Sequence, residues 1–344
     1  MVAYNEYLLD GTNVPVVWHA AAGNNPDIDE TCDWLTERRD DVDQIVQRQG
    51  GILLRGFECL QRAATFQRVL DVLAPNLMDY VGGSAPRRAV SGRIMTATDL
   101  PGTFSIPLHQ EMSYTDIAPD RIAFFCEIAP PVGGETTLGD MRQITGSIDP
   151  AVRARFDAHN GLQLRRNLPP PDKAMLRPGI PKPWTDVFGT TDRAEADRIV
   201  INSGWRGEWL DDGSIQLWQE IRPAMRTHPL TGDRVWYNQA HLFSPIGVLK
   251  RARQDGRDDM VRKIEAALAE TPHLLDRTFH GDGTPVADED TAHIYDVLAQ
   301  HAVPLQWRRG DALILDNILT AHGRRTYSGE RLILTALIKA ASVN

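Results

Sequence analysis

The sequence predicts a mainly β core that carries helical insertions. Five strand-like runs are interspersed with amphipathic stretches of helical period, and several Gly-rich turns lie between them. A nucleotide-binding α/β fold is not favoured, because no GxGxxG motif follows the first strand-like run and no GxxxxGK[ST] motif occurs in the chain.

The strand-like runs are rich in aliphatic, β-branched and aromatic residues. They are GILLRGF at 51–57, RIAFFCEIA at 121–129, RVWYNQ at 234–239, LQWRRGDALILDN at 305–317 and RLILTALIKA at 331–340. Apolar residues recur at helical spacing in six further stretches, at 36–49, 61–73, 149–159, 192–201, 256–270 and 288–301. Pro and Gly concentrate at 168–184, which indicates a long ordered loop beside a functional site.

Length and composition allow one large core or two smaller ones, and we expect a single domain over residues 1–344. The chain is 42% hydrophobic and 24% charged, so it is long and apolar enough to enclose a large core. No run approaches the roughly 20 apolar residues that span a bilayer. The N-terminal stretch also lacks the basic and apolar regions of a signal peptide. We therefore expect a soluble, cytoplasmic protein with no membrane partner.

The net charge of −9 argues against nucleic acid as a partner, because binding a phosphate backbone requires an excess of Lys and Arg on one face. Basic pairs begin at positions 38, 87, 165, 308 and 324, and this scatter is typical of a solvated surface. The three cysteines, Cys32, Cys59 and Cys126, lie far apart. We expect them to be small buried residues, not disulfide or metal ligands.

The octapeptide PLHQEMSY at 107–114 contains a candidate metal-binding pair. On an extended strand, side chains two residues apart point to the same face, so His109 and Glu111 would converge beside the strand. Two solvated polar residues near a strand end would give the same pattern. The pair therefore needs a third ligand from elsewhere in the chain.

His322 offers that third ligand, in the segment LILDNILTAHGRR between the last two strand-like runs. Two histidines and one carboxylate form the facial triad that binds Fe(II) and leaves three positions open for a bidentate co-substrate and O2. A structural zinc site would have four protein ligands, and a hydrolytic zinc site would leave fewer open positions.

Thr136 and Arg331 are candidates for binding that co-substrate. Thr136 follows two glycines in PPVGGETTLGD at 130–140, where the backbone can approach a ligand closely, and Arg331 stands at the entry to the last strand-like run. A guanidinium fork and a threonine hydroxyl would hold the distal carboxylate of 2-oxoglutarate. The 2-oxo acid end would then be free to chelate iron.

Five segments, HQEMSY, GGETTLGD, WYNQ, DNILTAHGR and GERLILTAL, together resemble the taurine dioxygenase and clavaminate synthase superfamily of Fe(II)/2-oxoglutarate oxygenases. Within it they are most similar to the amino-acid hydroxylases of the syringomycin-biosynthesis type. The resemblance implies a double-stranded β-helix, or jelly roll, over roughly 50–340, with insertions at roughly 145–230 and 245–302. It also implies that His109, Glu111 and His322 bind iron, and that Thr136 and Arg331 hold 2-oxoglutarate.

The activity that this resemblance implies is hydroxylation of an unactivated C–H bond in an amino acid or amino-acid-derived natural-product intermediate. O2 is consumed, and succinate and CO2 are released. Thr335 stands where sulfonate-binding members carry a second arginine, which argues against taurine. Glu111 argues against halogenation, because the halogenating relatives have a small residue there. A carrier-protein-tethered substrate, and desaturation or cyclisation in place of hydroxylation, are the open alternatives.

Four residues are candidates for substrate binding: Ser113, Tyr114, Asn238 and Arg324. A zwitterionic amino acid needs a cation for its carboxylate and acceptors for its ammonium group. Two other functions would fit the same core, namely a non-catalytic jelly-roll binding protein and a zinc hydrolase. Neither alternative gives Arg331 and Thr136 a shared catalytic purpose.

Overall fold

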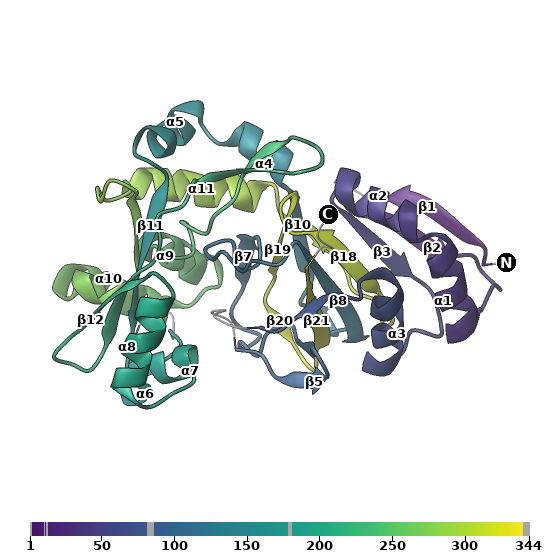
Figure 1. The fold of residues 1–344 in the computed structure, drawn as a ribbon, viewed down its shortest axis with the longest axis horizontal. Coiled ribbons are helices and arrows are strands. Elements are labelled where there is room, and N and C mark those ends of the chain that lie inside the picture. Colours follow the sequence, from purple (N-terminus) through teal and green to yellow (C-terminus); the bar gives the residue numbers. More distant parts are fainter. Residues whose placement is uncertain (1, 10, 12, 81–85, 178–180, 340–344) are drawn as a thin grey trace.

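Two β-sheets share one hydrophobic core at the centre of the molecule (Figure 1). The computed structural model describes residues 2–9, 11, 13–80, 86–177 and 181–339. The larger sheet has nine strands in the order β1-β2-β3-β18-β8-β21-β6-β5, with β4 beside β21. The smaller sheet has four strands in the order β17-β10-β19-β7. This arrangement confirms the predicted jelly-roll core with helical insertions.

The two sheets are built from short strands. The larger contains β1 Tyr4–Leu8, β2 Val16–Ala20, β3 Gly51–Arg55, β4 Leu77–Met78, β5 Ala89–Ser91, β6 Ile94–Thr96, β8 Arg121–Ile128, β18 Ala312–Asp316 and β21 Leu332–Ile338. The smaller contains β7 Ile106–His109, β10 Thr136–Asp140, β17 Val303–Leu305 and β19 Thr320–Arg324. Alternate side chains of the larger sheet, such as Leu53 and Phe124, pack in one core cluster with Leu138 of the smaller sheet.

The opposite face of the larger sheet is covered by three N-terminal helices, α1 Ile28–Glu37, α2 Arg39–Gln49 and α3 Ala63–Leu73, at the right of Figure 1. Their apolar stripes pack against the side chains that point away from the smaller sheet. The aromatic ring of Phe66 on α3 stacks on that of Phe125 on β8, with centroids 5.0 Å apart. Both faces of the central strands β3, β18, β8 and β21 are therefore buried.

A second, four-stranded sheet in the order β12-β13-β11-β16 lies at the left of Figure 1, and the sequence did not lead us to expect it. Its strands are β11 Leu162–Leu168, β12 Arg206–Trp209, β13 Ile215–Trp218 and β16 Arg277–His280. The helices around it and above the core are α4 Met141–Ser147, α5 Pro150–Ala158, α6 Pro171–Ala174, α7 Trp184–Phe188, α8 Arg193–Asn202, α9 Pro245–Gln254, α10 Asp258–Glu270 and α11 Asp288–Gln300. Two small ladders, β14 Met225–Thr227 with β15 Arg234–Trp236 and β9 Val132–Gly133 with β20 Tyr327–Ser328, complete the fold.

Most of the predicted elements match observed ones, and the differences have local causes. The helix predicted at 36–49 is two helices, because the chain leaves helical geometry at Arg38. The run at 305–317 is two strands, β17 and β18, separated by a turn at Gly310 where φ is +86°. Helices α1, α4, α6, α7 and α9 were not predicted. Residue 340 of the last predicted run and residues 178–180 of the predicted loop lie outside the described residues.

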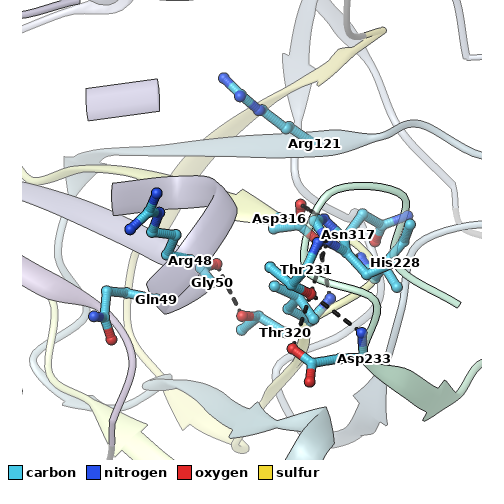
Figure 2. A network of polar contacts seen from close by, with 12 residues as sticks. Arg48, Gln49, Gly50, Arg121, His228, Thr231, Asp233, Asp316, Asn317 and Thr320 are labelled. Atoms are coloured by element: carbon cyan, nitrogen blue, oxygen red, sulfur yellow. Dashed lines mark hydrogen bonds and ion pairs between the residues drawn. The ribbon is translucent and has the colours of Figure 1, made fainter. Parts of the chain in front are cut away.

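The connection between β18 and β19 is fixed by a buried polar network (Figure 2). Asp316 accepts hydrogen bonds from the backbone N–H groups of Ile318 and Leu319, both at 2.8 Å. His228 Nδ1 accepts from the backbone N–H of Thr231 at 3.1 Å, so its Nε2 carries the proton that faces Asp316, also at 3.1 Å. The turn that carries Asn317 therefore has little freedom to move.

None of the helices formed by the described residues has both the length and the apolar character of a membrane span. This agrees with the absence of a long apolar run in the sequence.

We predict that Asp316→Ala will lower the free energy of unfolding by about 2–4 kcal/mol, because it leaves two buried backbone N–H groups and the His228 N–H without an acceptor. Asp79→Ala is the control, since the Asp79 side chain is 70% exposed in its ion pair with Arg93, and we expect it to cost under about 1 kcal/mol. Urea denaturation measures both. Equal, small losses in the two variants would contradict an anchoring role for Asp316.

Candidate metal centre

The register of two neighbouring strands brings the two candidate histidines together. His109 ends β7 and pairs directly with His322 in the middle of β19, and their ring centroids are 4.5 Å apart. His109 Nδ1 lies 2.9 Å from the carbonyl oxygen of Pro107. Donation from Nδ1 to that carbonyl leaves the Nε2 lone pair of His109 free for a metal. His322 was expected between two strands, but it lies within a short strand of its own.

Glu111 does not lie on the strand, which corrects the geometry expected for the pair. Strand β7 ends at His109, and Glu111 sits in the tight turn that follows, where Met112 has a φ of +53°. Asn317 holds this turn. Its Oδ1 accepts from the Glu111 N–H at 2.7 Å, and its Nδ2 donates to the Glu111 carbonyl at 2.9 Å. The carboxylate reaches the histidines through this turn and not through strand alternation.

The three side chains form a compact ligand cluster. Glu111 Oε2 lies 3.8 Å from His109 Nε2 and 3.7 Å from His322 Nε2, and one ligand atom from each residue lies within 4.8 Å of the others. Two imidazole nitrogens and one carboxylate oxygen on one side of an ion are the ligand set of a non-haem Fe(II) site. The residues present therefore fit the predicted metal.

The protonation states of the cluster also suit a metal. Burial by itself would raise the pKa of the Glu111 carboxyl, but the Arg87 guanidinium and the two imidazoles outweigh it and hold that pKa well below its usual range. Burial lowers the pKa of His322 to about 4. At neutral pH the site thus presents an ionised carboxylate and a neutral imidazole, which are the forms that bind metals.

Arg87 belongs to this site, although its basic pair was expected to lie on the solvated surface. Its side chain is 5% exposed, and its Nη2 donates to Glu111 Oε2 at 2.8 Å. The guanidinium lies over the Tyr80 ring, 4.3 Å from its centroid. The other two nitrogens, Nε and Nη1, are buried without a hydrogen-bond partner in the described part of the chain. The expectation that the basic pairs are solvated is therefore wrong for Arg87.

Thr136 and Arg331 line the same cavity as the triad. Thr136 begins β10 and is buried, and its Oγ1 accepts a hydrogen bond from Trp307 Nε1 at 2.9 Å. Because Oγ1 is the acceptor in that bond, its own proton remains available to a ligand. Arg331 directly precedes β21. Burial lowers its pKa to about 10, so its guanidinium stays charged at neutral pH.

The glycines before Thr136 do allow close contact with their backbone, but the groups in contact are other parts of the protein and not a ligand. Gly134 has a φ of +71°, and a Cβ there would lie 3.1 Å from Arg331 Cδ. At Gly133 a Cβ would lie 2.3 Å from the carbonyl oxygen of Thr326. The Arg331 Nε donates to the Gly134 carbonyl at 3.1 Å. The glycine pair therefore positions the arginine.

The cavity that contains these residues has a volume of about 520 Å³. Apolar side chains such as Phe124, Met112 and Ile333 form part of its wall, and the Phe124 ring packs edge-on against His322 with centroids 5.0 Å apart. A volume of this size accommodates a small organic molecule beside a co-substrate.

Comparison with known proteins decides the family. The profile of the taurine catabolism dioxygenase TauD, TfdA family matches residues 13–337. The chain belongs to this family. Among curated proteins, this TauD/TfdA-family chain is similar to the dapdiamide synthesis protein DdaC of Enterobacter agglomerans, with 30% identity over 299 residues that cover 86% of this chain and 84% of DdaC. It is also similar to a clavaminate synthase-like protein of Arabidopsis thaliana, with 29% identity over 301 residues that cover 87% of this chain and 84% of that protein.

Solved structures share the fold at low identity. PvcB of Pseudomonas aeruginosa superposes with a TM-score of 0.51 at 16% identity, covering 99% of this chain and 92% of PvcB. AAD-2, in complex with Mn(II) and N-oxalylglycine, gives a TM-score of 0.54 at 13% identity and covers 99% of this chain and 98% of its own. An asparagine oxygenase gives 0.52 at 12% identity, covering 91% and 83%. As a member of the TauD/TfdA family, the protein is an iron- and 2-oxoglutarate-dependent oxygenase.

The candidate substrate residues of this TauD/TfdA oxygenase line two different hollows. Tyr114 and Arg324 line the cavity at the triad, whereas Ser113 and Asn238 line a separate hollow of about 10 Å³. The Asn238 side chain is engaged by the backbone, because it donates to the Ala224 carbonyl at 2.9 Å and accepts from the Ala240 N–H at 3.0 Å. Ser113 and Asn238 therefore do not line the cavity that contains the triad.

Arg324 is buried and lines the cavity, but its guanidinium is committed to the protein. Nη1 donates to the Leu100 carbonyl at 3.1 Å, and Nη2 donates to the carbonyls of Pro101 at 2.9 Å and Phe104 at 2.5 Å. These bonds hold the segment that enters β7. Arg324 is a second basic residue for which the expected solvated surface is wrong.

We predict that Asn317→Ala will weaken Fe(II) binding by about 10- to 100-fold, the usual loss when a residue that orients a metal ligand is removed. The Glu111 turn loses both the donor and the acceptor that fix it. Anaerobic titration with Fe(II) measures the affinity, and Asn202→Ala on the exposed end of α8 is the control. Unchanged affinity in a folded Asn317→Ala protein would show that the turn holds its position without Asn317.

Proposed function

We propose that this protein hydroxylates an unactivated C–H bond of an amino acid or amino-acid-derived intermediate in natural-product biosynthesis, with 2-oxoglutarate converted to succinate and CO2. The observation that carries the proposal is the convergence of His109, Glu111 and His322 with Thr136 and Arg331 in one cavity. The similarity to DdaC, a dapdiamide synthesis protein, supports a biosynthetic role. The asparagine oxygenase of similar fold holds 3-hydroxyasparagine and succinate, which is in keeping with an amino-acid substrate.

We assign iron binding to His109, Glu111 and His322. Iron, when bound, supplies the oxidising power that activates O2 and breaks the C–H bond. The protein presents Glu111 as a carboxylate and His322 as a neutral imidazole, so neither must lose a proton first. Arg87 and Asn317 fix the orientation of Glu111 through its carboxylate and its backbone, respectively.

We assign the distal carboxylate of 2-oxoglutarate to Arg331 and Thr136. Arg331 supplies a partly buried positive charge, and the Thr136 hydroxyl supplies a proton whose direction is set by the bond from Trp307. The 2-oxo acid end of the co-substrate would then face the triad. The apolar wall formed by Phe124, Met112 and Ile333 excludes water from the reacting carbon.

The same site could act on an aminoacyl group tethered to a carrier protein, or could desaturate or cyclise its substrate. Neither a zinc hydrolase nor a non-catalytic binding protein is supported by Thr136 and Arg331. We place the reaction in the cytoplasm, because Cys32, Cys59 and Cys126 are all free thiols.

The decisive experiment loads the protein anaerobically with Fe(II) and then adds 2-oxoglutarate, O2 and a panel of amino acids. We expect one or more members to raise succinate formation above the background without substrate, with a product heavier by one oxygen atom. His109→Ala and His322→Ala should each abolish this turnover. Full activity in either histidine variant, or succinate formation that does not need iron, would refute the assignment.

We predict that Thr136→Val will raise the KM for 2-oxoglutarate about 10-fold, since it removes one buried hydrogen bond to a charged group. Arg331→Ala should raise it further, because it removes the charge as well. The kcat should change less than the KM in the threonine variant. Thr137→Val is the matched control, as Thr137 is buried on the same strand but does not line the cavity. Equal KM values in the two threonine variants would argue against Thr136 as a contact.

A further inference from the structure

One end of the cavity carries charged side chains that iron and 2-oxoglutarate leave unused. Arg166, Lys182, Arg251 and Asp276 all line the cavity that contains the triad. The basic pair at 165–166 was expected on the solvated surface, and no sequence motif pointed to Lys182, Arg251 or Asp276. These residues come from β11, α9 and two connecting segments, so only the fold brings them together.

Arg166 is the most deeply buried member of this group. It is 4% exposed, and its guanidinium carbon lies 5.3 Å from the centroid of the Phe243 ring and 6.0 Å from that of Tyr114. Its side chain forms no hydrogen bond or ion pair with any described residue, and its Nε is fully buried. Burying a cation without an anionic partner is costly. Among the described residues, aromatic rings pack on the Arg166 guanidinium and no carboxylate makes direct contact with it.

Asp276 provides the opposite charge beside it. This residue directly precedes β16, and its Oδ1 accepts from the backbone N–H of Asn167 at 2.6 Å, while its Oδ2 makes no hydrogen bond with the described residues. Burial raises the pKa of Asp276, and the nearby Arg166 opposes that rise. The two side chains do not form an ion pair with each other. A guanidinium and a carboxyl group thus line the same cavity and interact electrostatically without direct contact.

Two further cations make this end of the cavity favourable for a negative group. The side chains of Lys182 and Arg251 form no ion pair within the described chain, and the Arg251 Nε is buried without a partner. A carboxylate placed here would meet several N–H donors in a partly desolvated setting, where charge-assisted hydrogen bonds are strong.

We infer that Arg166 binds the free α-carboxylate of the substrate and that Asp276 binds its α-ammonium group. The inference rests on the proposed function and makes it more specific, because a thioester-tethered substrate has no α-carboxylate to offer Arg166. The substrate is therefore a free α-amino acid or a derivative that keeps both groups. Tyr114 lines the same cavity, follows Glu111 by three residues and has its ring 6.0 Å from the Arg166 guanidinium carbon. With its head group held at Arg166, the substrate would extend its side chain towards the triad.

The test measures binding without turnover. Protein loaded with Mn(II) and N-oxalylglycine is titrated calorimetrically with each of the twenty L-amino acids, their methyl esters and their N-acetylcysteamine thioesters. We expect binding by at least one free acid, and at least 30-fold weaker binding by its ester and thioester, roughly the effect of removing one partner of a buried charge pair. Binding of an ester or thioester as tight as that of its acid, or of no free acid at all, would overturn the inference.

Variants of Arg166 and Asp276 test whether these two residues bind the substrate head group. Arg166→Gln should weaken binding of that acid by at least 30-fold and remove its preference over the ester, and Asp276→Asn should weaken it as well. Arg165→Gln is the matched control, because the Arg165 guanidinium packs on Trp218 and Phe279 and does not line the cavity. Wild-type affinity in Arg166→Gln would overturn the inference.

A separate readout distinguishes this inference from the proposed function. Binding of 2-oxoglutarate to the Fe(II)-loaded protein, followed by its charge-transfer absorbance, should be the same in the wild type and in Arg166→Gln. Intact 2-oxoglutarate binding with equal acid and ester affinities would overturn the head-group assignment alone. Loss of 2-oxoglutarate binding in the wild type would overturn the proposed function and, with it, the inference.

Discussion

The antiparallel pairing of β7 with β19 is the constraint on which the site depends. It places His109 directly opposite His322 on the neighbouring strand. The separation of the two imidazoles is therefore fixed by backbone hydrogen bonds and not by flexible side chains. A one-residue slip of this register would turn one histidine to the other face of the sheet. The polar network at Asp316 anchors the turn before β19, and Asn317 in that turn holds Glu111. One short segment thus positions two of the three ligands.

The sequence named His109, Glu111, His322, Thr136 and Arg331 from the order and spacing of five motifs. Strand geometry accounts for part of this outcome, because His109, His322 and Thr136 lie on or at the end of strands and Arg331 directly precedes one. Glu111 lies in the turn after β7, so strand alternation did not place it. The sequence could not place Ser113, because the chain turns at Met112 with a positive φ and sends the next side chain into a separate hollow. Proximity in sequence to a ligand was a poor guide once the strand had ended.

The buried arginines were beyond prediction for a different reason. Whether a basic residue is solvated depends on what folds over it, and that comes from segments far away in the chain. Arg87 is covered by the triad turn, Arg166 by rings of Phe243 and Tyr114, and Arg324 by the carbonyls of the segment before β7. Two adjacent basic residues in the sequence look the same whether the arginine is solvated or is covered by a distant segment. The four-stranded sheet around β11 was missed similarly, since its strands are short and its order is set by long-range pairing.

The overall charge of the protein and the charge of its cavity have opposite signs, and this opposition follows from what the cavity must hold. Of the described residues that line it, six are Lys or Arg and four are Asp or Glu, in a chain whose net charge is −9. One of the four carboxylates, Glu111, would be neutralised by a bound metal. 2-Oxoglutarate brings two negative charges and an α-amino acid brings a carboxylate, so a cavity that binds both needs a cation at each end. In the proposed assignment, Arg331 meets that need for the co-substrate and Arg166 meets it for the substrate.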